Sequence, residues 1–572
     1  MKKIISIFMI GLLLFTSLIK VEANEKPYYK NVGVHDPSII KDGETYYVFG
    51  THGAAAKSQD LKNWDFFVTG DIYTHSLLGN IRENLKESFK WGGVAESNDI
   101  GGMGIWAPDV VYNQDFVKPN GDKGAYLMYY SISMGQDIEG INHARSLIGL
   151  AYADDIEGPY TFVENVIYTG FHKNEGKSHY SHTDFLDVFP NETPRDDYFT
   201  LDGSYDFNMY PNAIDPTIVT SHDDRLYMVY GSWHAGVWVL ELDKETGLPL
   251  RNQSYTYDDS IKNVDPYFGT QISGGYWTSG EGPYIQYHEP SGYYHLYVTY
   301  GGLNQNEEYN MRFFRSKNID GPYEDIDGKN PIFKTHGSDD RLGNRLMGSF
   351  EFVKEQTIDD DADIFDYRVP GHNSVLYDDN GNDYIFFHTR FKDTGEAHEL
   401  RVHQLLFNED GWPLIVPERY SEETVVEVAD DIAGTYLIVR QEQDNAKPSK
   451  TSLGITLEKN GSIKGKLKGT WSFEEGILSI TLANATYQGY LLKQKTATSG
   501  YHEDYTFTLI GSNGRTKGHS ILGIKISDLD AESLLKKAAD DLEPPRTKDV
   551  QANMKLPTQT YGGITIKWAA SN

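Results

Sequence analysis

The chain contains no cysteine among its 572 residues. Disulfides, a thiolate nucleophile, an anchor on a lipidated cysteine and cysteine-ligated zinc are therefore excluded. Basic residues are also scarce, since 52 Lys and Arg stand against 83 Asp and Glu and give a formal net charge of −31. Nucleic-acid binding requires clustered Lys and Arg, so we expect no nucleic-acid partner, and an anionic substrate is disfavoured as well. This charge is typical of a soluble extracellular protein.

A long apolar run is found only at the amino terminus, in "MKKIISIFMIGLLLFTSLIKVEAN". Two lysines precede a run from Ile4 to Ile19, and the small residues Val21 and Ala23 follow it. This pattern is typical of a secretory signal peptide, and the run is short for a membrane anchor. We predict that residues 1–23 are a signal peptide. The protein is then secreted and, after cleavage, not inserted in a membrane.

Aromatic residues are abundant, at 13% of the chain with 40 Tyr and 9 Trp. Five segments begin with a polar turn, continue as an alternating strand and turn back into a second strand. They open with "HDPSII", "WAPDVV", "AIDPTIV", "EGPYIQ" and "GHNSVL". We predict an all-β fold in which residues 27–420 form a five-bladed β-propeller. A β-sandwich also has short strands, but it gives no reason for the same opening to recur.

A smaller β-rich segment follows the propeller. Residues 421–530 alternate apolar and polar residues between Asn-Gly and Gly turns, which predicts a small antiparallel β-barrel. This barrel either binds polysaccharide or packs against the propeller. Residues 541–572 resemble the first strands of a bacterial immunoglobulin-like module, so we interpret the sequence as a fragment whose further modules follow Asn572.

The blade openings carry the candidate chemistry. They place Asp36, Asp109, Asp215, Glu281 and His372 at or beside the same position of successive blades. A single Asp-Pro is usually only a turn, but inner strands of a propeller surround one axis, so these side chains converge. Crowded carboxylates repel one another, which separates their pKa values. Glycoside hydrolysis uses that condition, because one carboxyl group must be protonated and another ionised.

Together, "VHDPS", "AIDPT", "SGEGPYI" and "GHNSV" resemble the glycoside hydrolase family 43 arabinanases, and most of all extracellular endo-1,5-α-L-arabinanases with a carboxy-terminal β-barrel. The resemblance implies that Asp36 is the general base and Glu281 the general acid. It implies that Asp215 raises the pKa of the acid and orients it. It also implies inversion at the anomeric carbon, with the two carboxyl groups roughly 6.5–9.5 Å apart.

The same resemblance places His372 beside a metal ion, usually calcium. Calcium prefers oxygen ligands, so water is expected to supply most of the others. The alternative is that His372 is hydrogen-bonded in the tunnel without a metal. For substrate contact we predict Trp106 and Asp109 in "IWAPD", with Trp233 and His234 in "GSWHAG". Either Trp alone is also compatible with blade core, and Asp109 is expected to hydrogen-bond a sugar or a loop.

The implied substrate is arabinan, a plant cell-wall polysaccharide, cleaved by a monomeric enzyme. Three alternatives remain open. An exo-acting α-L-arabinofuranosidase or β-xylosidase of the same family would have the same trio, and the long polar segment from Tyr168 to Tyr210 reshapes the cleft where endo and exo action differ. A non-catalytic sugar-binding propeller would not need the trio. A fructan-cleaving propeller expects Asn-Asp-Pro and Arg-Asp-Pro, whereas His35 and Ile214 precede these aspartates here.

Overall fold

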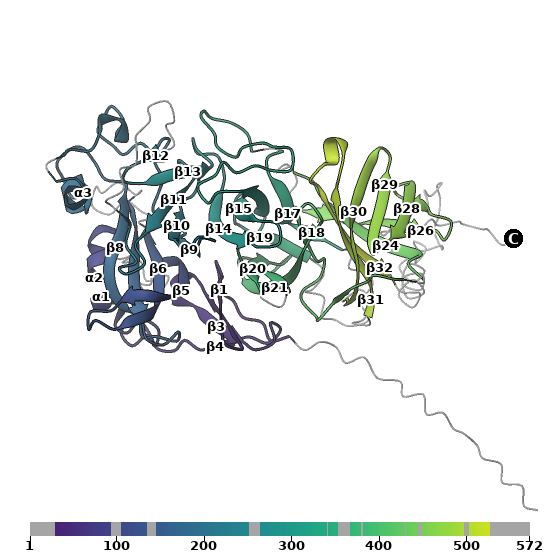
Figure 1. Ribbon diagram of the computed structural model, residues 1–572, viewed down its shortest axis with the longest axis horizontal. Helices are drawn as coiled ribbons and strands as arrows, with labels where there is room; N and C mark the ends of the chain where they lie inside the picture. The colour runs from purple at the N-terminus through teal and green to yellow at the C-terminus, as the bar shows by residue number, and fades with distance from the viewer. Residues whose placement is uncertain are drawn as a thin grey trace, which may run out of the picture.

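The computed structural model describes residues 29–92, 104–133, 145–190, 192–250, 264–339, 341–352, 366–378, 381–429, 431–443, 449–496 and 503–526. The predicted signal peptide and immunoglobulin-like segment lie outside these residues. The described chain forms a five-bladed β-propeller followed by a closed β-barrel of eight strands, which confirms the predicted fold class (Figure 1). No helix in the described ranges has both the length and the apolar character needed to cross a membrane.

Each blade is an antiparallel sheet made of strands that follow one another in the chain. Blade 1 contains β1 (Ser38–Asp42), β2 (Thr45–Phe49), β3 (Ala55–Ser58) and β4 (Asp65–Phe66). Blade 2 contains β5 (Ile105–Val117), β6 (Lys123–Ser133), β7 (Ser146–Ala153) and β8 (Thr161–Thr169). Blade 3 contains β9 (Thr217–Thr220), β10 (Leu226–Tyr230), β11 (Val237–Leu242), β12 (Val264–Asp265) and β13 (Gly269–Ser273).

The last two blades lie against the barrel. Blade 4 contains β14 (Glu281–His288), β15 (Tyr293–Tyr300), β16 (Asn310–Ser316) and β17 (Asn344–Gly348). Blade 5 contains β19 (Asp366–Tyr377), β20 (Asp383–Arg390), β21 (His398–Phe407) and β22 (Pro413–Ile415), and its sheet is extended by β18 (Phe350–Glu351) and β25 (Lys450–Thr451).

The hairpins form where alternating strands meet a tight turn. In blade 1, Asp42 pairs with Thr45 across a two-residue turn, and Gly43 takes the left-handed φ of 56° that such a turn requires. The apolar side chains of each pair face the neighbouring blades and are buried there. Packing between blades therefore supplies most of the propeller core.

Blades 1 and 5 close the ring by packing and not by a shared strand, as far as the described strands show. A buried cluster joins Val34, Ile39 and Val48 of the first blade region to Phe386 and Val402 of the last. Hydrogen bonds reinforce this cluster: the Leu400 N–H donates to the Val32 carbonyl at 2.9 Å, and Arg419 donates to Asn31 at 2.8 Å.

Between β8 and β9, the chain forms an insertion with its own aromatic core. It contains helix α3 (Phe185–Val188) and two short 3-10 turns, Tyr180–His182 and Asp196–Tyr198. Phe171 lies at its centre, with Phe185, Tyr198, Phe199 and Tyr205 around it, and this core joins Tyr267 and Phe268 of blade 3. Two further short helices, α1 (Ile81–Asn84) and α2 (Lys86–Gly92), link blades 1 and 2.

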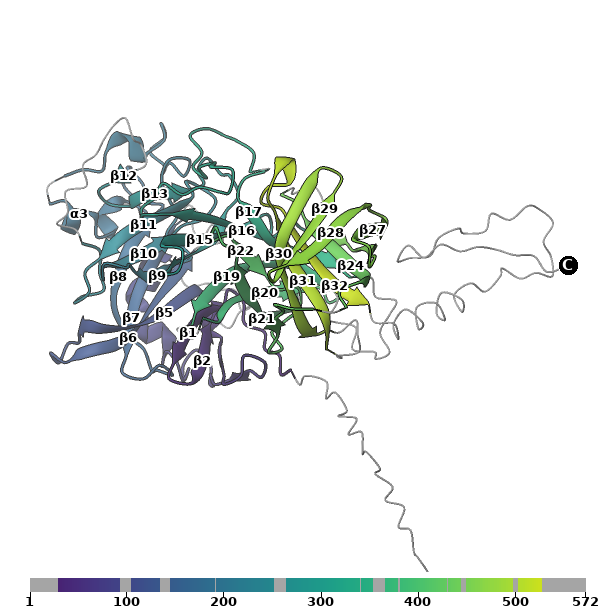
Figure 2. The same cartoon turned by 45° about the vertical axis from the view of Figure 1, so that its right-hand side comes forward.

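The barrel packs against the side of blades 4 and 5 (Figures 1 and 2). Its strands are β24 (Gly434–Gln441), β26 (Leu453–Leu457), β27 (Ser462–Gly465), β28 (Gly469–Glu474), β29 (Ile477–Leu482), β30 (Ala485–Lys495), β31 (Glu503–Gly511) and β32 (Ser520–Ile526). Pairing of β30 with β31 closes it, and β23 (Thr424–Val425) extends its sheet from the edge of β30.

Candidate active site

One residue in each of the five opening motifs takes the left-handed conformation. The φ values are 54° at Asp36, 39° at Ala107, 55° at Asp215, 55° at Gly282 and 47° at His372. The first four each precede a proline. Four of the five are not glycine, and a left-handed residue with a Cβ costs roughly 1–2 kcal/mol, so the recurrence indicates that the surrounding structure imposes it.

A ring of hydrogen bonds imposes the left-handed conformation on these five residues. The backbone N–H of each of these residues donates to a side chain of the preceding blade. The acceptors are His388 Nδ1 for Asp36 (3.2 Å), Thr51 Oγ1 for Ala107 (2.9 Å), Ser131 Oγ for Asp215 (3.1 Å), Asp215 Oδ2 for Gly282 (3.1 Å) and Thr299 Oγ1 for His372 (2.9 Å). The five openings are thereby oriented around one axis.

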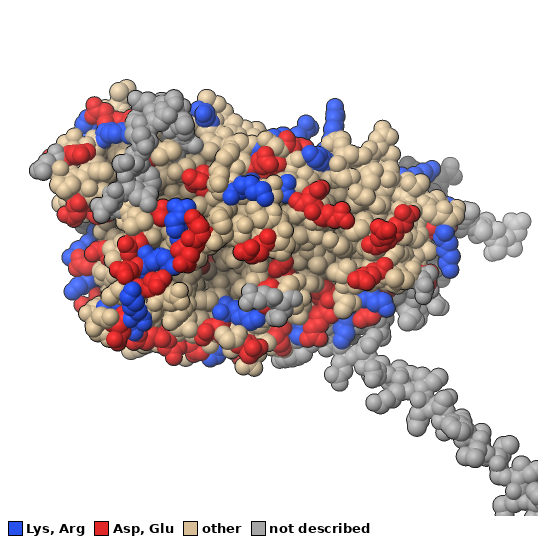
Figure 3. Space-filling view, viewed as in Figure 1, with Lys and Arg blue, Asp and Glu red and all other residues tan. Residues whose placement is uncertain are grey.

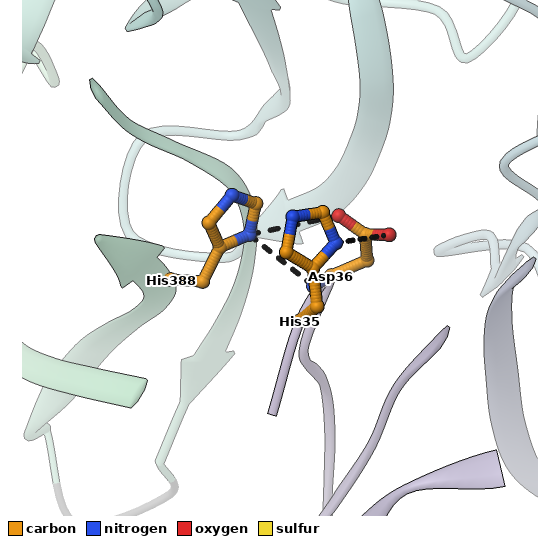
Figure 4. A group of neighbouring side chains, drawn as sticks. All are labelled: His35, Asp36 and His388. Atoms are coloured by element: carbon orange, nitrogen blue, oxygen red, sulfur yellow. Dashed lines mark hydrogen bonds and ion pairs between the residues drawn. The ribbon is translucent and has the colours of Figure 1, made fainter. Parts of the chain in front are cut away.

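Asp36 lies among histidines (Figure 4). His35 Nδ1 is 2.8 Å from its Oδ2 and His372 Nδ1 is 3.1 Å from its Oδ1, while the Thr51 hydroxyl donates to Oδ2 at 2.5 Å. Burial alone would raise the pKa of Asp36, but the imidazoles of His35 and His372 outweigh burial and hold this pKa well below its usual value. Asp36 is therefore ionised, as a general base must be.

Glu281 has the opposite electrostatic setting. Its Oε2 accepts a hydrogen bond from Trp233 Nε1 at 2.7 Å, and its Oε1 accepts one from the Tyr309 hydroxyl at 2.7 Å. Burial and the nearby charge of Asp215 raise the pKa of Glu281 to about 7. A large fraction of Glu281 is thus protonated at neutral pH, which suits a general acid.

Asp215 and His372 connect these two carboxyl groups. Asp215 accepts the N–H of Gly282, the residue after Glu281, and burial raises the pKa of Asp215 although His372 opposes the shift. Burial would lower the pKa of His372, but Asp36 and then Asp215 and Glu281 raise it. The imidazole thus favours its cationic form among three carboxyl groups, and the site separates the pKa values of Asp36 and Glu281.

The predicted substrate-binding residues occupy different places. Trp233 contacts the acid directly through its indole N–H. His234 packs between Phe207 and Trp277, with ring centroids 4.6 and 4.1 Å away. Trp106 is half-buried beside the left-handed Ala107, and its carbonyl accepts a hydrogen bond from the Ser131 hydroxyl at 3.3 Å.

Asp109 requires a correction, because its position does not suit the expected sugar contact. Its side chain is buried, and its oxygens accept hydrogen bonds from the Ser38 hydroxyl and, at 2.6 Å, from the Ile218 N–H. It therefore ties blade 2 to blades 1 and 3. Burial also raises the pKa of Asp109 to about 6. The residue of blade 2 equivalent to Asp36 is Ala107, two positions earlier.

Several contacts of the site were missed by sequence reasoning. Tyr309 immediately precedes β16, His388 lies on β20 and Thr51 belongs to a 3-10 turn, so no opening motif contains them. His388 is fully buried, its ring stacks on His35 at 3.8 Å, and its Nδ1 accepts the Asp36 N–H. Among the contacts that were missed, only His35 could have been identified from the sequence, because it is adjacent to Asp36.

Metal-binding capacity is centred on the same histidines. Candidate ligand atoms of His35, Asp36 and His388 lie within 4.8 Å of one another. The two imidazole Nδ1 atoms already hydrogen-bond to Asp36, so this trio is held by its own contacts. His372 uses Nδ1 toward Asp36, so Nε2 is the ring nitrogen that it can offer to a ligand.

An ionised carboxylate, a second carboxyl group with raised pKa and a third that supports it, all at the axis of a propeller, define a site of the glycoside hydrolase class. Residues 191–413 match Glycosyl hydrolases family 43, and residues 417–517 match a C-terminal lipocalin-like domain found with that family. The chain belongs to glycosyl hydrolase family 43.

Similar proteins cover nearly the whole described chain. "Extracellular endo-alpha-(1->5)-L-arabinanase 2" of Bacillus subtilis is 38% identical, over 86% of this chain and 93% of that protein. "Extracellular endo-alpha-(1->5)-L-arabinanase" of Thermotoga petrophila is 36% identical, over 88% of this chain and 96% of that protein. The crystal structure of the endo-1,5-alpha-L-arabinanase from Thermotoga petrophila RKU-1 matches with a TM-score of 0.70 at 35% identity, covering 88% of this chain and 100% of that one.

Proposed function

We propose that this protein is a secreted endo-1,5-α-L-arabinanase that hydrolyses arabinan, since two relatives that it matches over most of their length are named extracellular endo-alpha-(1->5)-L-arabinanases. The observation that carries this proposal is the opposite electrostatic setting of Asp36 and Glu281 at one propeller axis. A substrate without charge also agrees with the formal net charge of −31.

In the reaction we assign to the site, the carboxylate of Asp36 takes a proton from a water molecule. The water oxygen attacks the anomeric carbon of an arabinofuranose ring while the bond from that carbon to the glycosidic oxygen breaks. Glu281 donates its proton to the departing oxygen. The configuration is inverted, and no covalent intermediate forms. Proton exchange with solvent then restores both carboxyl groups.

The contacts around the two groups support these roles. His35, His372 and Thr51 hold the Asp36 carboxylate in a fixed orientation, so the lone pair that accepts the proton is positioned before substrate arrives. Trp233 and Tyr309 do the same for Glu281. Asp215 raises the pKa of Glu281 and holds the backbone that follows it.

The test is the early product profile from linear α-1,5-arabinan, compared with that of Glu281→Gln. A ladder of oligomers is expected from the wild-type protein, and the variant should lose about 10²–10⁴ of the rate because it has no proton to donate. Monomer as the sole early product would indicate an exo-acting enzyme. Binding without any product would indicate a non-catalytic propeller.

We infer that His372, in its neutral form and through Nε2, is the protein ligand of a calcium ion whose other ligands are mainly water. Binding of the ion would displace the proton that the neighbouring carboxyl groups favour on this imidazole. The support is that Asp36, the carboxylate next to His372, already accepts contacts from His35, His372 and Thr51. Such an ion would supply positive charge at the axis.

Dialysis against a chelator should lower the melting temperature and calcium should restore it, whereas His372→Gln should show no calcium response. A wild-type melting temperature insensitive to both treatments would oppose this assignment.

A further inference from the structure

The segment that leads into Glu281 carries an exposed tryptophan on an unusual backbone. It links β13 to β14 and reads "GGYWTSG" over residues 274–280. Tyr276 and Trp277 have φ values of 54° and 59°, so two consecutive bulky residues adopt the left-handed region. Such a conformation costs roughly 1–2 kcal/mol per residue. The side chain of Trp277 is nevertheless 49% exposed, so burial of the indole does not account for it.

The indole of Trp277 packs against His234, which packs against Phe207. Its ring centroid lies 4.1 Å from that of His234, which in turn lies 4.6 Å from Phe207. The backbone N–H of Trp277 donates to the backbone carbonyl of His234 at 2.8 Å. The insertion between β8 and β9 supplies Phe207 and also Met209, whose sulfur is 3.2 Å from the Tyr276 hydroxyl. The indole therefore packs against His234 with the ring planes inclined at 60°, while about half of the residue's surface meets solvent.

The brace is electrically neutral. Burial lowers the pKa of His234 to about 4, so this imidazole carries no charge near neutral pH. Its Nδ1 is buried and has no hydrogen-bond partner within the described residues. A rigid, half-exposed indole on a neutral support is the surface that stacks on the apolar face of a sugar ring.

The platform is tied to the acid at two points. Trp277 precedes Glu281 by four residues, and His234 follows Trp233, whose indole N–H donates to Glu281. The same short loop and the same dipeptide thus position both the acid and the exposed indole.

We propose that Trp277, braced by His234 and Phe207, is a stacking platform that binds a furanose ring of the polysaccharide away from the scissile bond. This inference rests on the proposed arabinan hydrolysis and adds a residue that determines chain-length preference. The insertion that supplies Phe207 thereby takes part in substrate recognition although it is remote from Asp36 in the chain.

The experiment compares linear α-1,5-arabinan with the shortest arabino-oligosaccharide that the wild-type enzyme cleaves. For Trp277→Ala, KM on arabinan is expected to rise about five- to tenfold with little change in kcat, as loss of one aromatic stacking contact implies. The effect on the short substrate should be much smaller, because that substrate does not reach the platform. Trp277→Phe should recover part of the lost affinity.

Tyr112→Ala is the matched control, since Tyr112 is 57% exposed and lies toward the β5–β6 turn, away from the opening of β5. It should change neither substrate's kinetics. Equal losses on long and short substrates would overturn the proposal, because they would mean that Trp277 only supports the Glu281 loop. An unchanged KM on arabinan would overturn it as well.

Failure of the proposed function is distinguishable from failure of the platform. If the wild-type protein released no product from arabinan, the activity assignment would fail by itself. Retardation of Glu281→Gln in gels containing arabinan or another neutral plant polysaccharide would then be compared with that of the double variant Glu281→Gln/Trp277→Ala. Weaker retardation of the double variant supports the platform, and equal retardation of the two proteins overturns it.

Discussion

At the scale of single residues, the site works by giving two carboxyl groups different surroundings. Asp36 faces imidazoles and a hydroxyl, so its charged form is favoured. Glu281 is buried near the charge of Asp215, and these two effects favour its neutral form although the Trp233 indole and the Tyr309 hydroxyl donate to it. The two roles therefore follow from contacts, since Asp and Glu have similar pKa values in water.

The pH profile should report this difference. In the role proposed for it, Glu281 acts when protonated, and its pKa of about 7 means that kcat/KM should fall as pH rises through that region. The Tyr309 hydroxyl donates to the carboxylate and so lowers this pKa. In Tyr309→Phe the pKa of Glu281 should rise, and the alkaline limb of kcat/KM should move to higher pH while the maximal rate decreases.

The control for that profile is Tyr129→Phe, which removes another buried hydroxyl whose partner is the Gly247 carbonyl, 2.7 Å away and outside the site. Its alkaline limb should coincide with that of the wild type. If the alkaline limb of kcat/KM in Tyr309→Phe stayed in place or moved to lower pH, a group other than Glu281 would be responsible for it.

At the scale of the element, each blade opening is a left-handed residue whose N–H is held by the preceding blade. Gly282 shows what this requires. A Cβ built there would lie 2.8 Å from His372 Cγ, so the imidazole would have to move away from Asp36. Gly282→Ala should therefore reduce kcat by about 10²-fold, the effect expected for an ångström-scale displacement of a catalytic group.

Gly43 provides the comparison for that variant. Its φ of 56° matches the 55° of Gly282, and a Cβ at Gly43 meets nothing within 4 Å. Both Gly→Ala variants should lose about 1 kcal/mol of unfolding free energy from the backbone alone, but only Gly282→Ala should lose activity. Equal activities in steady-state assays would show that the Gly282 contact does not position His372.

The same elements show how far sequence reasoning reached. Recurrence of a polar turn before an alternating strand is a long-range pattern that local propensity does not obscure, so the propeller could be predicted. Asp36, Asp215 and His372 were found because the motif contains them. Asp109 was misread because the nearest acid was taken, whereas the equivalent position is Ala107 before Pro108.

The contacts that tune the site could not be predicted in the same way. Tyr309 reaches Glu281 from the residue before β16 of the same blade, and His388 reaches Asp36 from β20 of the neighbouring blade. The sequence separations are 28 and 352 residues. Nothing near them in the sequence distinguishes them from other buried aromatic and imidazole side chains. Only the closed ring of blades brings them to the axis.

At the scale of the whole molecule, charge and architecture agree with a protein that acts on a neutral polymer. On the face seen in Figure 3, Lys and Arg lie among Asp and Glu and form no continuous basic strip in the part of the chain described. This distribution favours solubility over binding to polyanions. We expect a monomer, for which the elution volume in gel filtration at assay concentration is the check.

The barrel and the propeller share one core. Along β24 the buried side chains alternate, since Tyr436 and Ile438 face the barrel interior while Leu437 and Val439 join the cluster of blades 4 and 5. On the propeller side this cluster includes Met347, Phe350, Leu414 and Ile415, all nearly inaccessible to solvent. In addition, β18 pairs with β25 in parallel. The sequence left two roles open for the barrel, polysaccharide binding and packing against the propeller. The shared core shows that the barrel packs against the propeller.

This shared core predicts that the propeller depends on the barrel for stability. Val439→Asp places an unpaired charge where the side chain is 0% exposed, and it should destabilise the whole protein by about 3–5 kcal/mol. Thermal unfolding should show one transition at lower temperature, because both units lose the same interface. Thr470→Asp, on the exposed side of β28, should unfold like the wild type.

A chain ending at residue 420 would expose the apolar cluster and should aggregate. If that chain remained soluble with an unchanged melting temperature, the barrel would have to be retained for another reason, and polysaccharide binding would become its leading explanation.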